Sequence, residues 1–200
     1  MKRTSLMTAF LAPVAAVSLS GCGVNSIPTA EEEAKAKWAD VQAAYQRRAN
    51  LIPNLVSTVK GAAASEERIL TGVTEARANA TRITVTGDQL TDPQAMARFA
   101  DAQNRLTLSL QRLQEAYPQL QSQGNFATLM SQIEGTENRI NIAIRDYNSA
   151  VQNYNTTIRT FPAVIGAKVI YGAEPMATFE ATTPNADVAP TVNFDTNTSR

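Results

Sequence analysis

The feature that most constrains the fold of this sequence is an apolar repeat in which steps of three and four residues alternate for about five heptads. The repeat consists of Phe126, Met130, Ile133, Glu137, Ile140, Ile144, Tyr147, Val151, Tyr154, Ile158 and Phe161. This spacing places one apolar stripe on a long helix of a left-handed bundle, and Pro162 stops that helix. A helix of this length must lie beside another long helix, so the rest of the fold depends on its partner.

The partner is a helix predicted over residues 30–64, with Glu31, Glu32 and Glu33 in its first turn. Its apolar stripe consists of Trp38, Val41, Tyr45, Ile52, Leu55, Val59 and Ala62. Pro53 lies within it and deprives the carbonyl of Ala49 of its usual N–H donor, at a cost of about 3 kcal/mol. Because the stripe resumes in phase after Pro53, we predict a bend that curves this helix around the other long one. A functional hinge is the alternative.

Two shorter helices complete the pattern. Ser65 is a good N-cap for one that ends near Thr84, and Asp92-Pro93 is a start signal for one that ends at Pro118. Their apolar positions are Ile69, Leu70, Val73, Ala76, Ala80 and Ile83, then Met96, Phe99, Leu106, Leu110, Leu113 and Tyr117. The predicted fold is all-α: an antiparallel up-down four-helix bundle over residues 30–161, whose first helix is kinked at Pro53. The two long helices should pair alone over a narrower stretch.

The residues after the bundle form two predicted parts. Residues 162–181 should pack on or near the bundle, and within them 162–172 form a short amphipathic helix with Val164, Ile165, Val169 and Ile170 on its apolar face. From residue 182 to residue 200 the chain has no period, and we predict a disordered tail.

The N-terminal residues 1–21 have the layout of a signal peptide, with Lys2 and Arg3 ahead of an apolar stretch too short to span a membrane. Leu19, Ser20, Gly21 and Cys22 resemble a bacterial lipobox, Leu-[Ala/Ser]-[Gly/Ala]-Cys. We expect Cys22 to carry fatty acyl chains such as palmitate, with residues 22–29 as a tether to the bundle. The alternative is an ordinary cleaved signal peptide with an incidental cysteine.

The predicted compartment is extracytoplasmic: a membrane-anchored lipoprotein facing the periplasm or the cell exterior. Gly23 follows the lipidated cysteine, rather than the aspartate that retains many lipoproteins in the inner membrane. The outer membrane is therefore favoured if the organism is Gram-negative.

Composition excludes several chemistries. The sequence has no histidine and one cysteine, so a Cys/His zinc site, an intramolecular disulfide and a histidine-based triad cannot form. Gly-rich phosphate loops are absent as well. We predict no catalytic residue, no cofactor and no metal. Formal net charge is zero, and loss of Lys2 and Arg3 would leave a slightly acidic chain, which argues against nucleic acid as a partner.

Polar residues interrupt the apolar stripes at one level. Gln103 and Glu137 occupy stripe positions, Arg48 falls in the apolar phase of the first helix, and Arg47 is next to it. A buried carboxylate needs a partner. We hypothesise a structural polar layer of Arg47, Arg48, Gln103 and Glu137 that fixes helix register. The alternative is an enzyme or small-ligand binder that uses Glu137, for example as a general acid.

A second polar group lies beside Pro53: Asn50, Asn54, Ser57 and Lys60, three or four residues apart. These side chains have two interpretations. They bind the freed carbonyl of Ala49, directly or through water, or they form a contact band for a partner, which would be another envelope protein or a second copy of the chain.

Tyr147-Asn148 and Tyr154-Asn155 repeat at seven residues, as do Trp38 and Tyr45. We interpret the tyrosines as aromatic layers between the long helices, with a ligand-stacking role as the alternative.

Several of these motifs together resemble the LemA family, in the order expected and over roughly Trp38 to Glu180. They are Arg47-Arg48 with Leu51-Ile52-Pro53-Asn54-Leu55-Val56, Val73-Thr74-Glu75-Ala76-Arg77-Ala78, Tyr117-Pro118-Gln119-Leu120, Glu137-Asn138-Arg139-Ile140, Tyr147 to Asn155, and Phe161-Pro162. The resemblance implies an antiparallel helical bundle and no established enzymatic activity. Many members begin with a transmembrane helix, whereas this chain has a lipobox there. The expected function is that of a lipid-anchored, non-enzymatic helical interaction or scaffold module.

Overall fold

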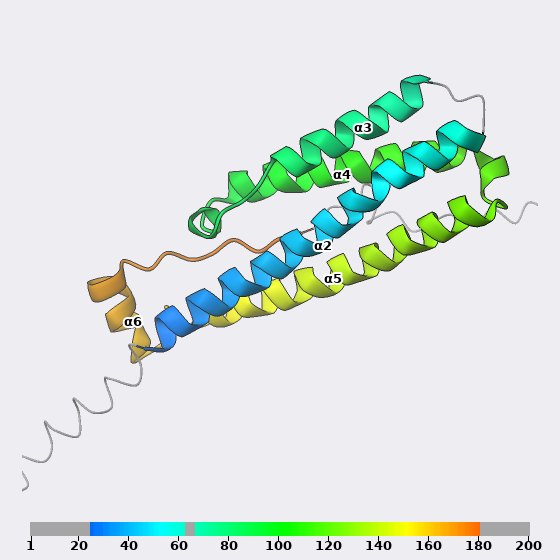
Figure 1. Ribbon diagram of the computed structural model, residues 1–200. Helices are drawn as coiled ribbons and strands as arrows, with labels where there is room; N and C mark the ends of the chain where they lie inside the picture. The colour runs from blue at the N-terminus through cyan, green and yellow to red at the C-terminus, as the bar shows by residue number, and fades with distance from the viewer. Residues whose placement is uncertain (1–24, 63–66, 181–200) are drawn as a thin grey trace, which may run out of the picture.

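The computed structural model describes residues 25–62 and 67–180, and these form an all-helical fold. The long helices are α2 (Ser26–Ala62) and α5 (Gly124–Thr157), and the shorter ones are α3 (Glu67–Arg82) and α4 (Pro93–Ala116). Successive helices run in opposite directions (Figure 1). The predicted antiparallel up-down bundle with two long helices is therefore confirmed.

The helices differ in how much of the long pair they cover. α2 and α5 lie side by side along most of their length, whereas α3 packs on α4 and also against α2. At the end where α2 begins, the long pair projects beyond α3 and α4 (Figure 1). This is the predicted narrower stretch, although an extended segment, residues 172–180, runs back along it.

The first helix starts earlier than the sequence suggested. We expected residues 22–29 to be a tether, but Ser26–Thr29 already belongs to α2, and Ile27 is fully buried in the core. Pro28 is compatible with this start, because a proline in the first turn replaces an N–H that has no intrahelical partner. The part of the predicted tether before Asn25, like the lipobox Leu19–Cys22, lies outside the described residues.

Local signals explain the other boundaries. The carboxylate of Asp92 accepts a 2.8 Å bond from the backbone N–H of Gln94 and caps α4, with Pro93 at the first helical position. Two short 3₁₀ turns, η1 (Gly87–Gln89) and η2 (Pro118–Leu120), fill the connections on either side of α4. α5 begins at Gly124 and ends at Thr157, four residues before the predicted end at Phe161. The N-cap predicted at Ser65 and the tail over 182–200 fall outside the described residues.

The core consists of two apolar clusters stacked along the bundle axis. One cluster contains Trp38, Val41 and Tyr45 of α2 and Ile140, Ile144 and Tyr147 of α5, together with Phe99 and Phe179. The other contains Ile52, Leu55 and Val59 of α2, Ile133 of α5, and the apolar faces of α3 and the second half of α4. Between the two clusters lie the polar residues Arg48 of α2, Gln103 of α4 and Glu137 of α5.

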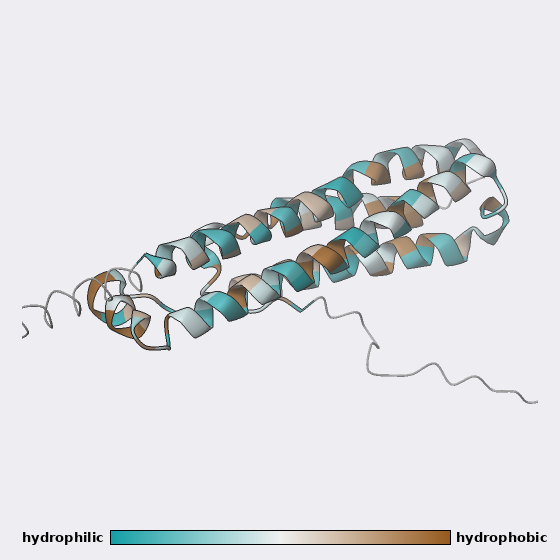
Figure 2. Ribbon diagram, turned by 90° about the horizontal axis from the view of Figure 1, so that it is seen from below, coloured by the Kyte–Doolittle hydropathy of each residue, from teal (hydrophilic) through white to brown (hydrophobic). Residues whose placement is uncertain are grey.

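The chain after α5 turns back across the end of the bundle. It forms α6 (Ala163–Gly166) and a π-helical turn, η3 (Ala167–Tyr171), which ends at Gly172 with φ +56°. The predicted short helix therefore exists, but its faces are reversed. The small residues Ala163, Gly166 and Ala167 are buried, while Ile165, Val169 and Ile170 face outward. Figure 2 shows this turn as a mostly hydrophobic end of the ribbon.

Candidate functional site

The centre of the bundle holds one buried charge, the guanidinium of Arg48, whose residue is only 1% exposed. Its Nη1 donates to the carboxylate of Glu137 on α5 at 2.5 Å and to the hydroxyl of Thr107 on α4 at 3.0 Å. Its Nη2 donates to the side-chain oxygen of Gln103 at 3.0 Å and to the backbone carbonyl of the same residue at 3.3 Å. One arginine of α2 thus binds α4 and α5 at one level.

Gln103 extends this layer to the fourth helix. Its Nε2 donates a 3.1 Å bond to the carbonyl of Ala80, which belongs to the last turn of α3 and has no intrahelical donor. The buried hydroxyl of Thr136, next to Glu137 on α5, donates to the carbonyl of Ile133 at 2.6 Å. The layer therefore joins all four helices and separates the two apolar clusters of the core.

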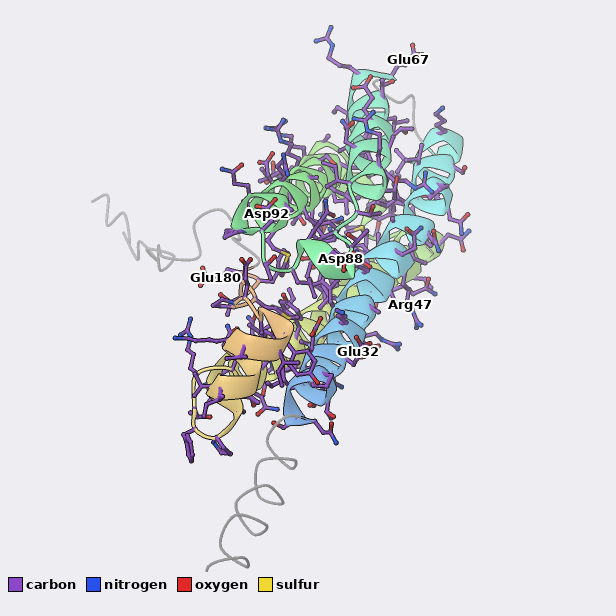
Figure 3. The ribbon with its side chains drawn as sticks, turned by 90° about the vertical axis from the view of Figure 1, so that its left-hand side faces the viewer. Glu32, Arg47, Glu67, Asp88, Asp92 and Glu180 are labelled. Carbon is purple, nitrogen blue, oxygen red and sulfur yellow. The ribbon has the colours of Figure 1, made fainter. Side chains whose placement is uncertain are left out.

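The structure brings together three of the four residues predicted for the layer. Arg47 is the exception, because its side chain points away from the bundle into solvent (Figure 3). The 100° step between successive helical residues puts only one of the two arginines toward α5. Thr107 was missed, because a threonine on a polar flank of α4 carries no sequence signal that distinguishes it from a surface residue.

Most polar groups of the layer have a hydrogen-bond partner or an opposite charge nearby. Arg48 and Glu137 are oppositely charged, and the Glu137 side chain keeps 38% of its surface exposed at the edge of the bundle. The guanidinium also lies 5.0 Å from the centre of the Tyr45 ring, a cation–π distance. Burial raises the pKa of Tyr45 to about 12, with a lowering by Arg48 and a further raising by Glu137. In the described residues, only Nε of Arg48 is a buried side-chain atom without a hydrogen-bond partner.

Pro53 lies inside α2, which continues through it as the in-phase pattern predicted. The carbonyl of Ala49, which Pro53 deprives of its donor, accepts a 2.8 Å bond from Nε of Arg77 on α3. The predicted donors Asn50, Asn54, Ser57 and Lys60 make no such bond. They face solvent because they lie on the exposed side of α2, whereas the carbonyl points toward α3. Arg77 was missed because a long-range donor has no signature in the sequence.

The same four side chains therefore form an exposed polar band, defined here as Asn50, Asn54, Ser57 and Lys60. Within it, the side-chain oxygen of Asn50 accepts a 2.9 Å bond from Gln46, one turn earlier on α2. The band thus presents amide, hydroxyl and ammonium groups to the outside of the bundle.

An aromatic cluster lies on the other side of the polar layer. Trp38 contacts Tyr147, Phe99 and Phe179, with ring centroids 5.0, 5.4 and 5.4 Å away. Its indole N–H donates a 2.8 Å bond to the carbonyl of Val85, so α2 also holds the connection between α3 and α4. The rings pack mostly edge to face on one another in the core, which is the arrangement of a structural aromatic layer.

The two asparagines seven residues apart on α5 have a specific role. The amide of Asn148 both donates to and accepts from the backbone of Phe179, each at 2.8 Å, and Asn155 does the same with Met176 at 2.9 Å. Two helical turns and three extended residues both span about 10 Å, so the spacings match. With Tyr147 donating to the carbonyl of Ala177 at 2.8 Å, this asparagine clamp seats the segment 173–180 on the bundle.

The described residues contain one small cleft next to the polar layer, with a volume of about 240 Å³. It is lined by Gln42, Tyr45, Gln46, Thr81, Phe99 and Gln103, among others, and none of its lining residues is charged. Arg48 and Glu137 do not line it. Among residues 25–62 and 67–180, no group of three or more acidic or cysteine side chains is placed to hold a metal ion.

The family model of LemA matches residues 37–194, which is more than three quarters of the chain. The chain belongs to the LemA family. No curated protein matches it significantly. The LemA match contains the polar layer, the exposed band and the asparagine clamp, so these are features of the LemA-like part of the chain. It begins after the lipobox Leu19–Cys22, and in the part of the chain that the structure describes, no helix combines the length and apolar character needed to cross a membrane.

Proposed function

We propose that this LemA-family chain is a lipid-anchored bacterial envelope protein whose bundle is a non-enzymatic interaction module. Acyl chains on Cys22 would hold the bundle at a membrane, facing the periplasm or the cell exterior, with outer-membrane sorting in a Gram-negative organism. The exposed band would contact another envelope protein or a second copy of the chain. Support for the anchor comes from the sequence, where Leu19-Ser20-Gly21 precedes the only cysteine.

The hydrogen bonding within the polar layer is the observation that supports a non-enzymatic role. The terminal nitrogens of Arg48 donate hydrogen bonds to Glu137, Gln103 and Thr107, and Gln103 in turn donates to the carbonyl of Ala80. A general acid must reach the atom that it protonates, and Glu137 is instead engaged by an arginine on its inner side. This arrangement supports a layer that fixes helix register rather than one that acts on a substrate.

The cleft beside Gln103 favours a second candidate function, that of a small-ligand binder. Its volume of about 240 Å³ is below the roughly 300–1,000 Å³ of typical ligand sites, and its uncharged lining offers amides, hydroxyls, rings and aliphatic side chains. Ligand-observed NMR with a fragment library tests it, with Gln46→Trp as a variant that fills the mouth. If the bundle is an interaction module, we expect no fragment to bind the wild-type chain and fail to bind Gln46→Trp. A fragment that binds only the wild-type chain would favour the ligand-binding function.

The anchor is tested by growing cells with an alkyne-tagged fatty acid. We expect the wild-type chain to incorporate the label and to fractionate with membranes. Cys22→Ser should lose both properties, while Ser20→Ala, which keeps the lipobox pattern, should retain them. An unlabelled wild-type chain, or a Cys22→Ser chain that is labelled as strongly, would contradict the lipid anchor.

A further inference from the structure

Large apolar side chains are exposed in an unusual concentration at one end of the molecule. In the described residues six of them are exposed, and five fall within residues 161–171, namely Phe161, Ile165, Val169, Ile170 and Tyr171. Phe161 and Val169 are 80% and 78% exposed. The sixth, Ile142, stands by itself in the middle of α5. We refer to these five residues as the apolar end.

The orientation of the apolar end is opposite to that of the rest of the bundle. In a helix that packs on the core of a water-soluble protein, the large apolar side chains face inward. In α6 and η3 the inward positions are Ala163, Gly166 and Ala167, and the branched and aromatic side chains face outward. An exposed apolar patch of this kind marks a surface that contacts a membrane, a ligand or another protein.

The position of the apolar end indicates that it contacts a membrane. α6 lies beside the start of α2, at the end where the long helix pair projects beyond α3 and α4 (Figure 1). Cys22 lies only three residues before Asn25, where the described chain begins. Even fully extended, three residues span at most about 11 Å. An acyl chain on Cys22 therefore places this end of the bundle at the surface of the leaflet.

The composition of the apolar end fits an interface. Tyr171 combines an apolar ring with a polar hydroxyl, as do the residues that gather at the level of lipid headgroups. Arg159 and Lys168 lie within or next to this stretch of sequence, and long basic side chains can keep their charge among headgroups while their stems lie in apolar surroundings. The short α6–η3 turn is too small to span a bilayer but can lie in its surface.

We propose that the apolar end is a second, non-covalent membrane contact that inserts shallowly into the leaflet holding the acyl chains of Cys22. The proposal rests on the lipid anchor proposed above. Because the acyl chains already retain the protein, the contribution of this contact is orientation: it fixes the end of the α2–α5 pair against the membrane and directs the band on α2 and the ends of α3 and α4 away from it.

The test uses the full lipidated chain in phosphatidylethanolamine–phosphatidylglycerol vesicles. Acylation consumes the thiol of Cys22, so Val169→Cys introduces a unique site for an environment-sensitive fluorophore, and Ile142→Cys is the matched control on α5. We expect lipids with a nitroxide near the headgroup to quench the label at position 169 at least twofold more than the label at position 142. Equal, weak quenching at both positions would overturn the proposal.

Two further outcomes are distinguishable. A label at position 169 that shifts to the blue without nitroxide quenching would overturn the lipid contact and show that protein covers the apolar end. If a free thiol on the wild-type chain shows that Cys22 is not acylated, the lipid anchor fails separately. The same two labels are then compared in a Cys22→Ser background with excess vesicles, where stronger quenching at position 169 supports a lipid contact and equal quenching overturns it.

Discussion

The side chain of Arg77 in α3 donates a 2.8 Å hydrogen bond to the carbonyl of Ala49, the backbone group that Pro53 leaves without a donor. The interruption in α2 is therefore answered by a neighbouring helix rather than by α2 itself. This contact, between residues 28 positions apart in the sequence, couples the packing of α3 to a proline that disfavours its own helix.

This relationship predicts a measurable coupling between Arg77 and Pro53. Arg77→Met should lower the free energy of unfolding by about 1–3 kcal/mol, because it leaves a buried carbonyl without a partner. Pro53→Ala restores an N–H to that carbonyl, so in the Pro53→Ala background the same change should have little effect. Urea unfolding of the four proteins gives the coupling energy, expected at about 1–3 kcal/mol. Additive effects would mean that Arg77 does not satisfy the proline site.

The polar layer predicts a large difference between two adjacent arginines. Arg48→Met should destabilise the bundle by about 2–4 kcal/mol, since it removes a buried cation that binds α4 and α5. Arg47→Met changes an exposed side chain and should stay within about 0.5 kcal/mol of wild type. Thermal and urea unfolding measure both. Similar losses in the two variants would contradict the placement of Arg48 at the centre of the layer.

Replacing the whole layer separates stability from register. Well-packed apolar residues often substitute for a buried ion pair without loss, so Arg48→Met/Gln103→Leu/Glu137→Leu should recover most of the stability lost by Arg48→Met. If the layer fixes register, this triple variant should also show broader or doubled amide NMR signals along α2 and α5. A single sharp set of signals would argue against the register role.

The asparagine clamp predicts a local effect at the end of the described chain. Asn148→Asp keeps one acceptor but replaces the donor to the Phe179 carbonyl with a negatively charged oxygen. Hydrogen exchange at the amides of Met176 and Phe179 should accelerate at least tenfold, because the segment loses the attachment at its end and keeps those of Asn155 and Tyr147. Asn141→Asp, at an exposed position of α5, is the control. Unchanged protection in Asn148→Asp would mean that the Phe179 ring, Asn155 and Tyr147 hold the segment without the Asn148 amide.

Burial of Tyr45 predicts a stability change in alkaline solution. Its pKa rises from 10.0 to about 12 in the folded state, so the folded chain keeps the phenolic proton over a range where the unfolded chain loses it. The resulting stability is present below pH 10 and is lost as the pH rises toward 12. Tyr45→Phe keeps the ring and removes this titration. Between pH 9 and 11.5 its unfolding free energy should fall by about 1–2 kcal/mol less than that of wild type.

The bundle could be predicted because the sequence signals for its helices are local and periodic. The stripes of α2 and α5 follow from residue spacing, and Asp92-Pro93 marks the start of α4 through chemistry within one turn. The level of the polar layer was visible for the same reason, since Gln103 and Glu137 interrupt those stripes. The sequence also placed Arg48 in the apolar phase of α2, but it did not exclude Arg47, because the rotation of α2 against α5 decides which arginine faces inward.

The remaining differences come from contacts between distant segments. Arg77 with Ala49 and Asn148 with Phe179 join residues 28 and 31 positions apart, and no spacing rule connects them. The reversed faces of α6 and η3 were missed because amphipathic periodicity identifies an apolar face without showing whether core or membrane covers it.

The most direct test of the interaction module is photo-crosslinking in living cells from the exposed band. A photoreactive residue is placed at Asn50, Asn54 or Ser57 of α2, and at Asn138 or Asn141 of α5 as exposed controls. We expect a discrete product from the band positions, with another envelope protein or with a second copy of the chain, and none of comparable yield from the α5 positions. The absence of products from all three band positions, or equal products from both helices, would contradict it.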